Sequence, residues 1–516
     1  MNALIPKNAQ HIRGELSGWD RIVFRGYMRV LCYANGMAGY LSRVGVLLKD
    51  FGKYAQAMTD RLIEASTAAA QEADRPVIYL PSPKIRKDEY ARNIALEHGI
   101  QDGLICVLTA VEPCCGYEIY RNRAKKILEL KPRMRKCKFI YHYWIDPRFG
   151  FMSARIQTWF PFSTQICVNG REWLSRRMDE IGLSYKRYEN SFPWIDDFAK
   201  AQTIMDRMLK INWPNVLDAV AKKLNPAHGR MFRGLDMSYY WSAYQTEWAT
   251  DTAFTSSQAL AKIYPQLVRG AIATFGSHDV LRFLGKRPTL NYQGEVISDY
   301  KDRPEGVRVK HQAYKNSVKV YDKGSSVLRV ETTITNPAVF QSYHSSERDP
   351  QGPKSWRAMR KGVADMSRRA EVSHQCNQRY ADALASLDTS TPILQLASKV
   401  CRPTRKNGKR YRALRPWSEQ DRKLLESISD GEFVLEGFRN CDLAARLYGS
   451  KPADRTERGR IASKVSYRLR ILRAHGLIRK LPKRRRYQMT TKGRQIVSAL
   501  LQSQHVTLQQ LNALAA

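Results

Sequence analysis

The sequence predicts an α+β protein, with a mixed α/β N-terminal region that contains antiparallel sheets and a C-terminal domain of helices and one β-hairpin. Residues 307–334 alternate apolar and polar side chains around two turns, which is typical of antiparallel strands. A strand, a helix and a second strand follow one another at 77–110. Residues 416–516 contain the start and stop signals of several short helices.

The charge of the chain is its strongest compositional signal. Its 516 residues include 86 Lys and Arg but only 48 Asp and Glu, which gives a net charge of +38. So many positive charges repel one another unless a polyanion neutralises them, so DNA is the expected partner and RNA is a possible one. A hydrophobic content of 43% indicates a folded protein rather than a disordered one.

Several classes of protein are excluded by what the sequence lacks. Its longest apolar run, 103–111, is shorter than the ~18–20 residues that span a bilayer, and residues 1–16 lack the apolar core of a signal peptide. The nine cysteines form no CxxC pair, which argues against a zinc ribbon. We therefore expect a cytoplasmic protein with reduced thiols and no membrane partner. Nothing in the sequence fixes an oligomeric state.

Residues 1–135 predict a first, mixed α/β domain. Residues 1–75 show helical spacing, although the run RIVFRGYMRVL at 21–31 fits a strand equally well. A strand at 77–80, a helix at 88–98 and a strand at 104–110 form a βαβ-like unit. No glycine-rich phosphate-binding motif accompanies this unit, so we expect no nucleotide site.

Residues 136–335 predict a hairpin, several helices and the antiparallel sheet. The hairpin spans 136–160 around a turn at Asp146–Gly150. We expect a helix at 239–251, where Glu247 and Asp251 share one face as a metal-compatible pair or as an ordinary polar edge. Further helices are expected at 169–181, 198–210, 213–224, 256–275 and 278–284.

The sheet at 307–334 gathers polar side chains on one face. Period two places Lys319, Tyr321 and Lys323 together on one strand, and Arg329 and Glu331 together on the next. The turn at 324–326 makes these strands neighbours, so Glu331 should lie close to Lys319 or Lys323. This face is either an ordinary solvated surface or a functional one.

Residues 336–400 predict a helical segment, and 401–415 a basic linker. A long helix is expected at 356–387. Seven basic residues and no acidic one fall within 402–415, which suits a solvated linker or a set of phosphate contacts that includes Arg410 and Arg412.

Residues 416–516 predict a winged helix-turn-helix domain. Helices at 418–427, 440–448 and 460–475 precede a hairpin of 477–480 with 486–489, and a last helix follows. Residues 401–516 hold 27 Lys and Arg against 9 Asp and Glu, which favours nucleic acid over a protein partner. The expected contacts come from the third helix and from the wing: Lys464, Arg468, Arg470, Arg473, Lys480, Lys483, Arg484, Arg485 and Arg486.

Two sequence patterns resemble known families. The run GLIRKLPKRRRYQMTTKGRQI resembles the wing and closing helix of MarR-like and ArsR-like regulators. The chain as a whole resembles a group of long bacterial proteins with MarR-like tails, which implies no established activity. Residues 320–323, VYDK, with 328–331, LRVE, resemble the YDK…LRxE pattern of plasmid and filamentous-phage replication initiators.

The second resemblance implies a chemistry. Those initiators nick one DNA strand with a tyrosine and a divalent metal, so it implies that Tyr321, Glu331 and Lys323 are catalytic and that Mg²⁺ or Mn²⁺ is a cofactor. Asp146 and Glu247 are further candidate carboxylates for the metal, and Arg329 is a candidate nucleic-acid contact. The chain has no His-hydrophobic-His metal motif.

Three functions are compatible with these observations. The first is a DNA-binding protein of a mobile element, acting as an initiator, nickase or transposase, which clustered carboxylates would favour. The second is a non-catalytic DNA-binding transcriptional regulator, which a ligand cavity or a symmetric dimer would favour. The third is an RNA-binding component of a ribonucleoprotein, which co-purifying RNA would reveal.

Overall fold

The chain forms two compact units. The computed structural model describes residues 8–82, 84–224, 226–232, 234–235, 237–286, 294–301, 307–346, 349–385, 393–429, 438–449, 454–481 and 485–504. The first unit comprises Met1–Val268, Phe283–Gly285 and Val296–Ala381. The second comprises Arg269–Arg282, Lys286–Glu295 and Asp382–Ala516. The prediction that α and β structure are mixed is confirmed.

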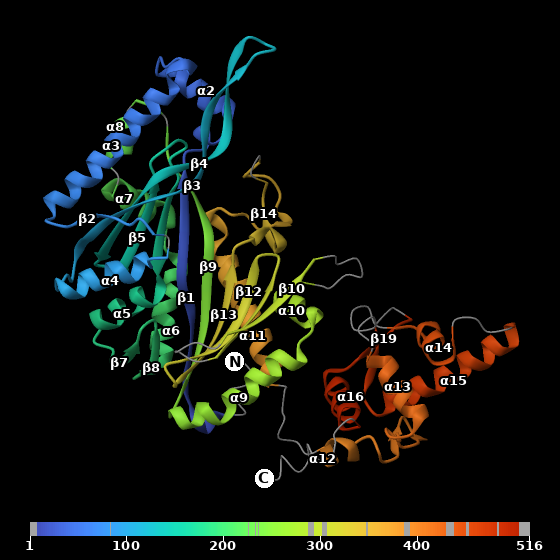
Figure 1. Ribbon diagram of the computed structural model, residues 1–516. Coiled ribbons are helices and arrows are strands. Elements are labelled where there is room, and N and C mark those ends of the chain that lie inside the picture. The colour runs from blue at the N-terminus through green and yellow to red at the C-terminus, as the bar shows by residue number, and fades with distance from the viewer. Residues whose placement is uncertain are drawn as a thin grey trace. The chain divides into compact units, whose positions relative to one another are not determined.

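One large sheet organises the first unit (Figure 1). Nine of the ten pairings between its eleven strands are antiparallel, and the tenth, between β2 and β3, is parallel. From one edge to the other, the strands are β10 (Val296–Lys301), β11 (Arg308–Ala313), β12 (Asn316–Lys323), β13 (Val327–Ile334), β9 (Tyr240–Phe254), β1 (Ile12–Tyr27), β6 (Thr164–Asn169), β5 (Gly150–Gln157), β4 (Ile127–Asp146), β3 (Gly103–Asn122) and β2 (Val77–Tyr79).

The two central strands correct two sequence predictions. Residues 239–251, expected to be a helix, lie in β9, which pairs with both β1 and β13. Residues 1–75, expected to show helical spacing, include β1, where buried Ile22 and Phe24 alternate with more exposed residues, so the strand alternative for the run at 21–31 is confirmed over 21–27. Two flanking strands satisfy both edges of each strand, and this tertiary pairing outweighs the helical spacing of the aromatic residues.

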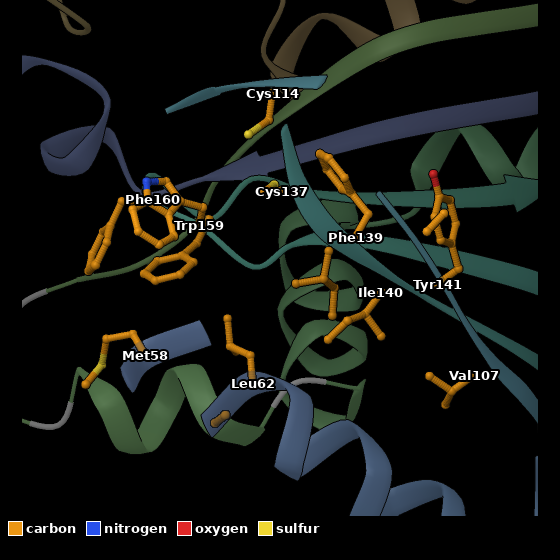
Figure 2. Close-up of a cluster of buried hydrophobic side chains, with 14 of the residues drawn as sticks. Met58, Leu62, Val107, Cys114, Cys137, Phe139, Ile140, Tyr141, Trp159 and Phe160 are labelled. Carbon is orange, nitrogen blue, oxygen red and sulfur yellow. The ribbon is translucent and has the colours of Figure 1, made fainter. Parts of the chain in front are cut away.

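Two hydrophobic cores pack helices against the sheet. In the first, α2 (Ala34–Arg43) and α3 (Phe51–Glu72) cover β3 and β4, and Figure 2 shows Met58 and Leu62 of α3 facing Ile140 and Trp159. The second core is built by α5 (Gly170–Glu180), α6 (Phe198–Arg207) and α7 (Trp213–Leu224) on β1, β5 and β6. The remaining helices of eight or more residues before residue 386 are α4 (Lys87–Glu97), α9 (Ser257–Thr274) and α11 (Met366–Ala385), and the shorter ones are α8 (Pro226–Met231) and α10 (Ser277–Phe283).

Local sequence explains where several elements start and turn. The Asn169 side chain accepts hydrogen bonds from the backbone N–H groups of Arg171 and Glu172 and so caps α5. Tyr314 and Lys315 both have positive φ, as do Gly324 and Ser325, which suits the tight turns on either side of β12. These turns fix the register of β11, β12 and β13, and the three strands predicted at 307–334 are confirmed.

The second unit contains the helices and the hairpin expected at the C-terminus. These are α13 (Glu419–Ser429), α14 (Asn440–Tyr448), α15 (Arg455–Ala474), the paired strands β18 (Ile478–Lys480) and β19 (Tyr487–Met489), and α16 (Thr491–Ser503). Leu424, Leu469, Leu472 and Ile496 are buried in a core of their own. A short helix, α12 (Ile393–Ser398), precedes them.

Three stretches differ from the expected boundaries. The boundary expected at 135/136 falls inside β4, so one sheet includes strands from both sides of it. The helix expected from 356 begins only at Met366, after β15 (Ser355–Ala358) has paired with β14 (Gln341–His344). The segment expected to be a basic linker contains the hairpin of β16 (Thr404–Lys406) and β17 (Lys409–Tyr411). Among the described residues, no helix has the length and apolar character to cross a bilayer.

Candidate functional site

A cluster of ionisable side chains lies on one face of the large sheet. The strand pairings place Lys319 opposite Glu331, Tyr321 opposite Arg329, and Arg21 opposite Glu247. These residues come from β12, β13, β9 and β1, which are neighbours in the sheet although β1 lies more than 200 residues before the other three in the sequence. We call this set of six residues the polar-face cluster.

Glu331 is the centre of the polar-face cluster. Its side chain is buried, and it is bound on both carboxylate oxygens. The Tyr321 hydroxyl donates a hydrogen bond of 2.7 Å to Oε2, and the Lys319 ammonium lies 2.5 Å from Oε1. Burial alone would raise the pKa of Glu331, but Lys319 and Tyr321 together lower it, so the carboxylate is ionised at neutral pH.

A second carboxylate, Glu247, approaches this site. Burial, and then the charge of Glu331, raise its pKa to about 7, while Lys319 acts in the opposite direction. A carboxylate whose pKa is raised by burial and by a neighbouring carboxylate is a common feature of functional sites. Glu247 and Asp251 do share a face, as expected, but on a strand rather than on a helix, because a spacing of four is even and a strand has a period of two.

Tyr321 is kept in its protonated form. Its pKa is raised well above the usual value, mainly by burial and then by the charge of Glu331. Tyr321 is half-buried as a whole residue, and its hydroxyl donates its hydrogen bond to the buried Glu331. Its oxygen is therefore a nucleophile only when Glu331 or another base takes its proton.

Arg329 has a structural position. It is fully buried, and its guanidinium forms two hydrogen bonds with Asp251, of 2.6 and 2.8 Å. A third nitrogen lies 3.4 Å from Asp20, and the buried Arg171 lies 3.1 Å from Asp251. Arg329 was expected to contact nucleic acid, but these partners hold its guanidinium inside the protein.

Two further predicted site residues lie away from the cluster. The Lys323 ammonium pairs with Glu189 of the hairpin formed by β7 (Tyr185–Tyr188) and β8 (Ser191–Ile195), and not with Glu331. Asp146 is the last residue of β4, and its carboxylate accepts hydrogen bonds from the backbone N–H groups of Arg148 and Phe149 in the turn that follows. Five strand spacings separate β4 from β13, which is about 24 Å, so Asp146 is too distant to share a metal with Glu331.

Two hollows open on the surface next to the cluster. The first, of about 310 Å³, is lined by Glu247, Lys319 and basic residues of β11, among them Arg308 and Lys310. The second, of about 700 Å³, shares Lys315 with the first and is lined by two exposed tyrosines, Tyr244 and Tyr314. Cations therefore surround the carboxylates on the accessible side, which suits an anionic ligand such as a phosphodiester.

The described residues give limited support for a metal site. No group of three or more His, Cys, Asp or Glu side chains suitable for a metal ion occurs in the described part of the chain. Glu331 and Glu247 supply two carboxylates, with Lys319 beside them. His142, a further candidate, is buried, and burial lowers its pKa to about 4.

In the second unit, α15 presents most of the expected nucleic-acid contacts. Lys464, Arg470 and Arg473 are exposed on this helix, and Arg468 is partly exposed, with its guanidinium over the Tyr448 ring. Lys480 and Arg485 are exposed and Arg486 is partly exposed at the hairpin of β18 and β19, whereas Lys483 and Arg484 lie outside the described residues.

The basic segment before α13 is held in place. Arg412 makes two hydrogen bonds of 2.7 Å with Asp421 of α13, and the Lys406 ammonium donates one of 2.9 Å to the carbonyl of Arg473. Arg412 therefore has a structural partner, whereas Arg410 is exposed.

Sequence reasoning missed two members of the site. Arg21 was hidden by the helical interpretation of β1, and Asp20 is brought to Arg329 only by the sheet order. The alternation of Arg21, Val23 and Arg25 with buried Ile22 and Phe24 is the signal that could have identified β1 and its exposed face. Comparisons with protein-family models, curated proteins and solved structures find no match to the chain.

Replacing Arg329 by Met should strongly destabilise the first unit. The change leaves Asp20 buried without its cation and leaves Asp251 with Arg171 as its remaining ion-pair partner among the described residues, which costs about 3–5 kcal/mol of unfolding free energy. The control Arg133→Met removes a pair between exposed side chains, with Glu118, and should cost no more than about 1 kcal/mol. Urea denaturation of both variants measures the difference, and equal losses would contradict the structural role of Arg329.

Glu247 should make stability depend on pH. Between about pH 4.5 and pH 7 the folded protein retains a proton that the unfolded chain has released, so raising the pH through this window lowers the unfolding free energy. Glu247→Gln removes this effect, and its stability relative to the wild type should rise by about 1–3 kcal/mol from about pH 5 to about pH 8. Thermal denaturation at both pH values tests this, and a constant difference would contradict the raised pKa. In a Glu331→Gln background, the change in pH dependence caused by Glu247→Gln should be smaller, because the charge of Glu331 no longer raises the pKa of Glu247.

Proposed function

We propose that this protein binds DNA and cuts one strand at the polar-face cluster, as a replication initiator or related nickase of a mobile element would. The supporting observation is that Tyr321 is hydrogen-bonded to Glu331, and that the neighbouring Glu247 lines a hollow together with basic side chains. The resemblance of residues 320–331 to plasmid and phage initiators agrees with this assignment. The large excess of positive charge supplies the attraction to DNA.

The proposed reaction is a transesterification. The Tyr321 oxygen forms a bond to the phosphorus of one phosphodiester, the bond from phosphorus to the 3′ oxygen breaks, and Glu331 accepts the phenolic proton over 2.7 Å. Lys319 donates a proton to the leaving 3′ oxygen. It recovers one from Glu331, whose Oε1 lies 2.5 Å from its nitrogen, so both groups return to their starting charges.

The carboxylates fit a divalent cation that also takes oxygen from its substrate. Mg²⁺ commonly uses one or two protein carboxylates and completes its coordination with phosphate oxygens and water. Glu331 and Glu247 would hold such an ion, and their mutual repulsion favours a cation there. When bound, Mg²⁺ or Mn²⁺ would neutralise negative charge on the reacting phosphate. Lys319 would then pair with the substrate instead of with Glu331.

We also propose that the second unit is a winged helix-turn-helix domain that binds duplex DNA. The order α13, α14, α15, β18, β19, α16 is that of such a domain, and α15 presents Lys464, Arg470 and Arg473 to solvent. A helix of this kind fits the major groove of B-DNA. A non-catalytic regulator would retain this binding and lack strand cleavage. An RNA-binding protein would prefer RNA to DNA of equal length.

Strand cleavage tests the proposed chemistry. Wild-type protein with Mg²⁺ or Mn²⁺ should nick supercoiled DNA and cut single strands, leaving labelled DNA covalently attached to the protein. Tyr321→Phe should lose the covalent product, and Glu331→Gln should lower the rate by about 10²–10⁴ because the general base is removed. The control Tyr79→Phe changes an exposed tyrosine on β2 and should cut normally. If the covalent DNA–protein adduct still forms in Tyr321→Phe but not in Tyr314→Phe, the nucleophile is Tyr314 and not Tyr321.

Salt dependence tests the proposed role of α15. Replacing Lys464, Arg470 and Arg473 by Gln should weaken duplex DNA binding, and should lower the slope of log affinity against log salt by about 0.9 for each phosphate that the protein no longer neutralises. Arg422→Gln with Lys423→Gln changes two exposed cations on α13 and serves as the control. Fluorescence anisotropy of labelled duplex over a salt series gives both slopes. Equal slopes in all three proteins would contradict this placement of the DNA.

A further inference from the structure

The hairpin of β3 and β4 extends beyond the strands that flank it. In Figure 1 it is the long ribbon that projects past α2. The strand β5 pairs with β4 only over Phe139–Asp146, and β2 pairs with β3 only over Val77–Tyr79 with Val107–Thr109. The twelve residues 127–138 pair only with β3, which gives a two-stranded ribbon about 40 Å long.

This ribbon has a fixed base and an exposed tip. Tyr117 and Leu130 are buried in the first hydrophobic core, and the Arg135 guanidinium stacks 3.7 Å from the Trp159 ring. Most residues of 120–128 are exposed. The anchored base holds the tip at a constant orientation, so its side chains reach a partner without first ordering the arm. We call residues 119–129 the arm tip.

The charge of the ribbon calls for a polyanion. Residues 121–138 contain nine Lys and Arg and one Asp or Glu. Lys131 pairs with Glu129, and Arg133 pairs with Glu118. Within the described chain, no salt bridge is found for the remaining exposed cations of the ribbon: Arg121, Arg123, Lys125, Lys126, Lys136 and Lys138. Six neighbouring cations without carboxylate partners repel one another unless phosphates lie among them.

The shape of the arm selects the type of nucleic acid. The major groove of B-DNA is about 12 Å wide and admits a two-stranded β-ribbon, whereas the major groove of double-stranded RNA is too narrow. The arm also exposes Tyr120, Ile127 and Leu128, and apolar side chains of this kind can contact thymine methyl groups. A protein partner fits less well, because lysine is depleted in protein–protein interfaces.

We propose that the β3–β4 arm inserts into the major groove of duplex DNA, and thereby places the protein on the double-stranded DNA next to the strand that is cut. This inference rests on the proposed function, because it assumes that the partner is DNA. In this proposal the part of the first unit that recognises the duplex is the β3–β4 arm. The arm and Glu331 lie on opposite halves of the sheet, because four strands lie between β4 and β13.

The test compares two charge-matched triple variants of the full chain. Arg121, Arg123 and Lys125 of the arm tip are replaced by Gln in one variant. In the control, Lys200, Lys222 and Lys223, which are exposed on α6 and α7, are replaced by Gln. Lys126, which has a positive φ in the turn at the tip, is kept so that the turn itself is unchanged. Equal denaturation midpoints establish that both variants are folded.

The arm variant should bind a 30-base-pair DNA duplex about tenfold or more weakly than the control at ~0.15 M salt, with a salt slope lower by about two to three. Its affinity for single-stranded DNA, and its cleavage of a single strand, should equal those of the control. Bulky substituents on the pyrimidine C5 atoms, which fill the major groove, should reduce wild-type binding to the level of the arm variant.

Other outcomes overturn the proposal in distinguishable ways. Equal duplex affinity of the two variants, or an equally large decrease on single strands, would show that the arm does not recognise a duplex. If the arm variant loses more affinity for RNA duplexes than for DNA duplexes, the arm recognises RNA. If wild-type protein still binds the C5-substituted DNA normally, the arm does not enter the major groove. Wild-type protein that binds no nucleic acid would overturn the proposed function as well, whereas normal strand cleavage by the arm variant would leave that function intact.

Discussion

The buried guanidinium of Arg329 is the interaction on which the first unit depends most. It connects β13 to Asp251 of β9, to Asp20 of β1 and to the backbone carbonyl of Asn190 in the β7–β8 turn. A charge buried this deeply is stable only when carboxylates face it at short distance. Both halves of the sheet meet at β9 and β1. The ion pairs of Arg329 therefore fix the strands that carry Glu331 relative to those that carry Arg21 and Glu247.

The polar-face cluster combines two patterns that usually occur apart. Lys319 and Tyr321 stabilise Glu331 as an anion, which is typical of a structural ion-pair network. Glu247 nevertheless lies close enough for its pKa to rise to about 7, which is typical of sites that handle protons or cations. A phosphate that draws Lys319 away would leave the two carboxylates facing each other. Substrate binding would thus change the charge balance of the site, which is the property that the proposed cleavage requires.

The sequence predicted the elements whose signals are local. The strands at 307–334 follow from period-two alternation and short turns, and the pairing of Glu331 with Lys319 follows from that register. The C-terminal elements follow from caps and glycines. The Asn407–Gly408 turn, with positive φ at both residues, is also a local hairpin signal, and treating 401–415 only as a linker overlooked it.

What the sequence did not predict depends on long-range pairing. A spacing of four residues, as between Glu247 and Asp251, repeats on both a helix and a strand, so only the partners β1 and β13 decide between them. The β3–β4 arm was not predicted, because its length depends on where β5 and β2 stop pairing. Asp20 and Arg171 join Asp251 from distant parts of the chain, and no local pattern relates them.

An eleven-stranded sheet has two outer strands, and their composition bears on how the protein behaves at high concentration. A long, flat, apolar outer strand would be a template for pairing with another molecule. The outer strand β2 is only three residues long and is followed by Pro81. At the other edge, β10 carries Asp299 and Lys301, and the Asp299 carboxylate pairs with the Lys301 ammonium. Both edges thus oppose the fibrous self-association to which large sheets are prone, so molecules built on so wide a sheet can remain separate at high concentration.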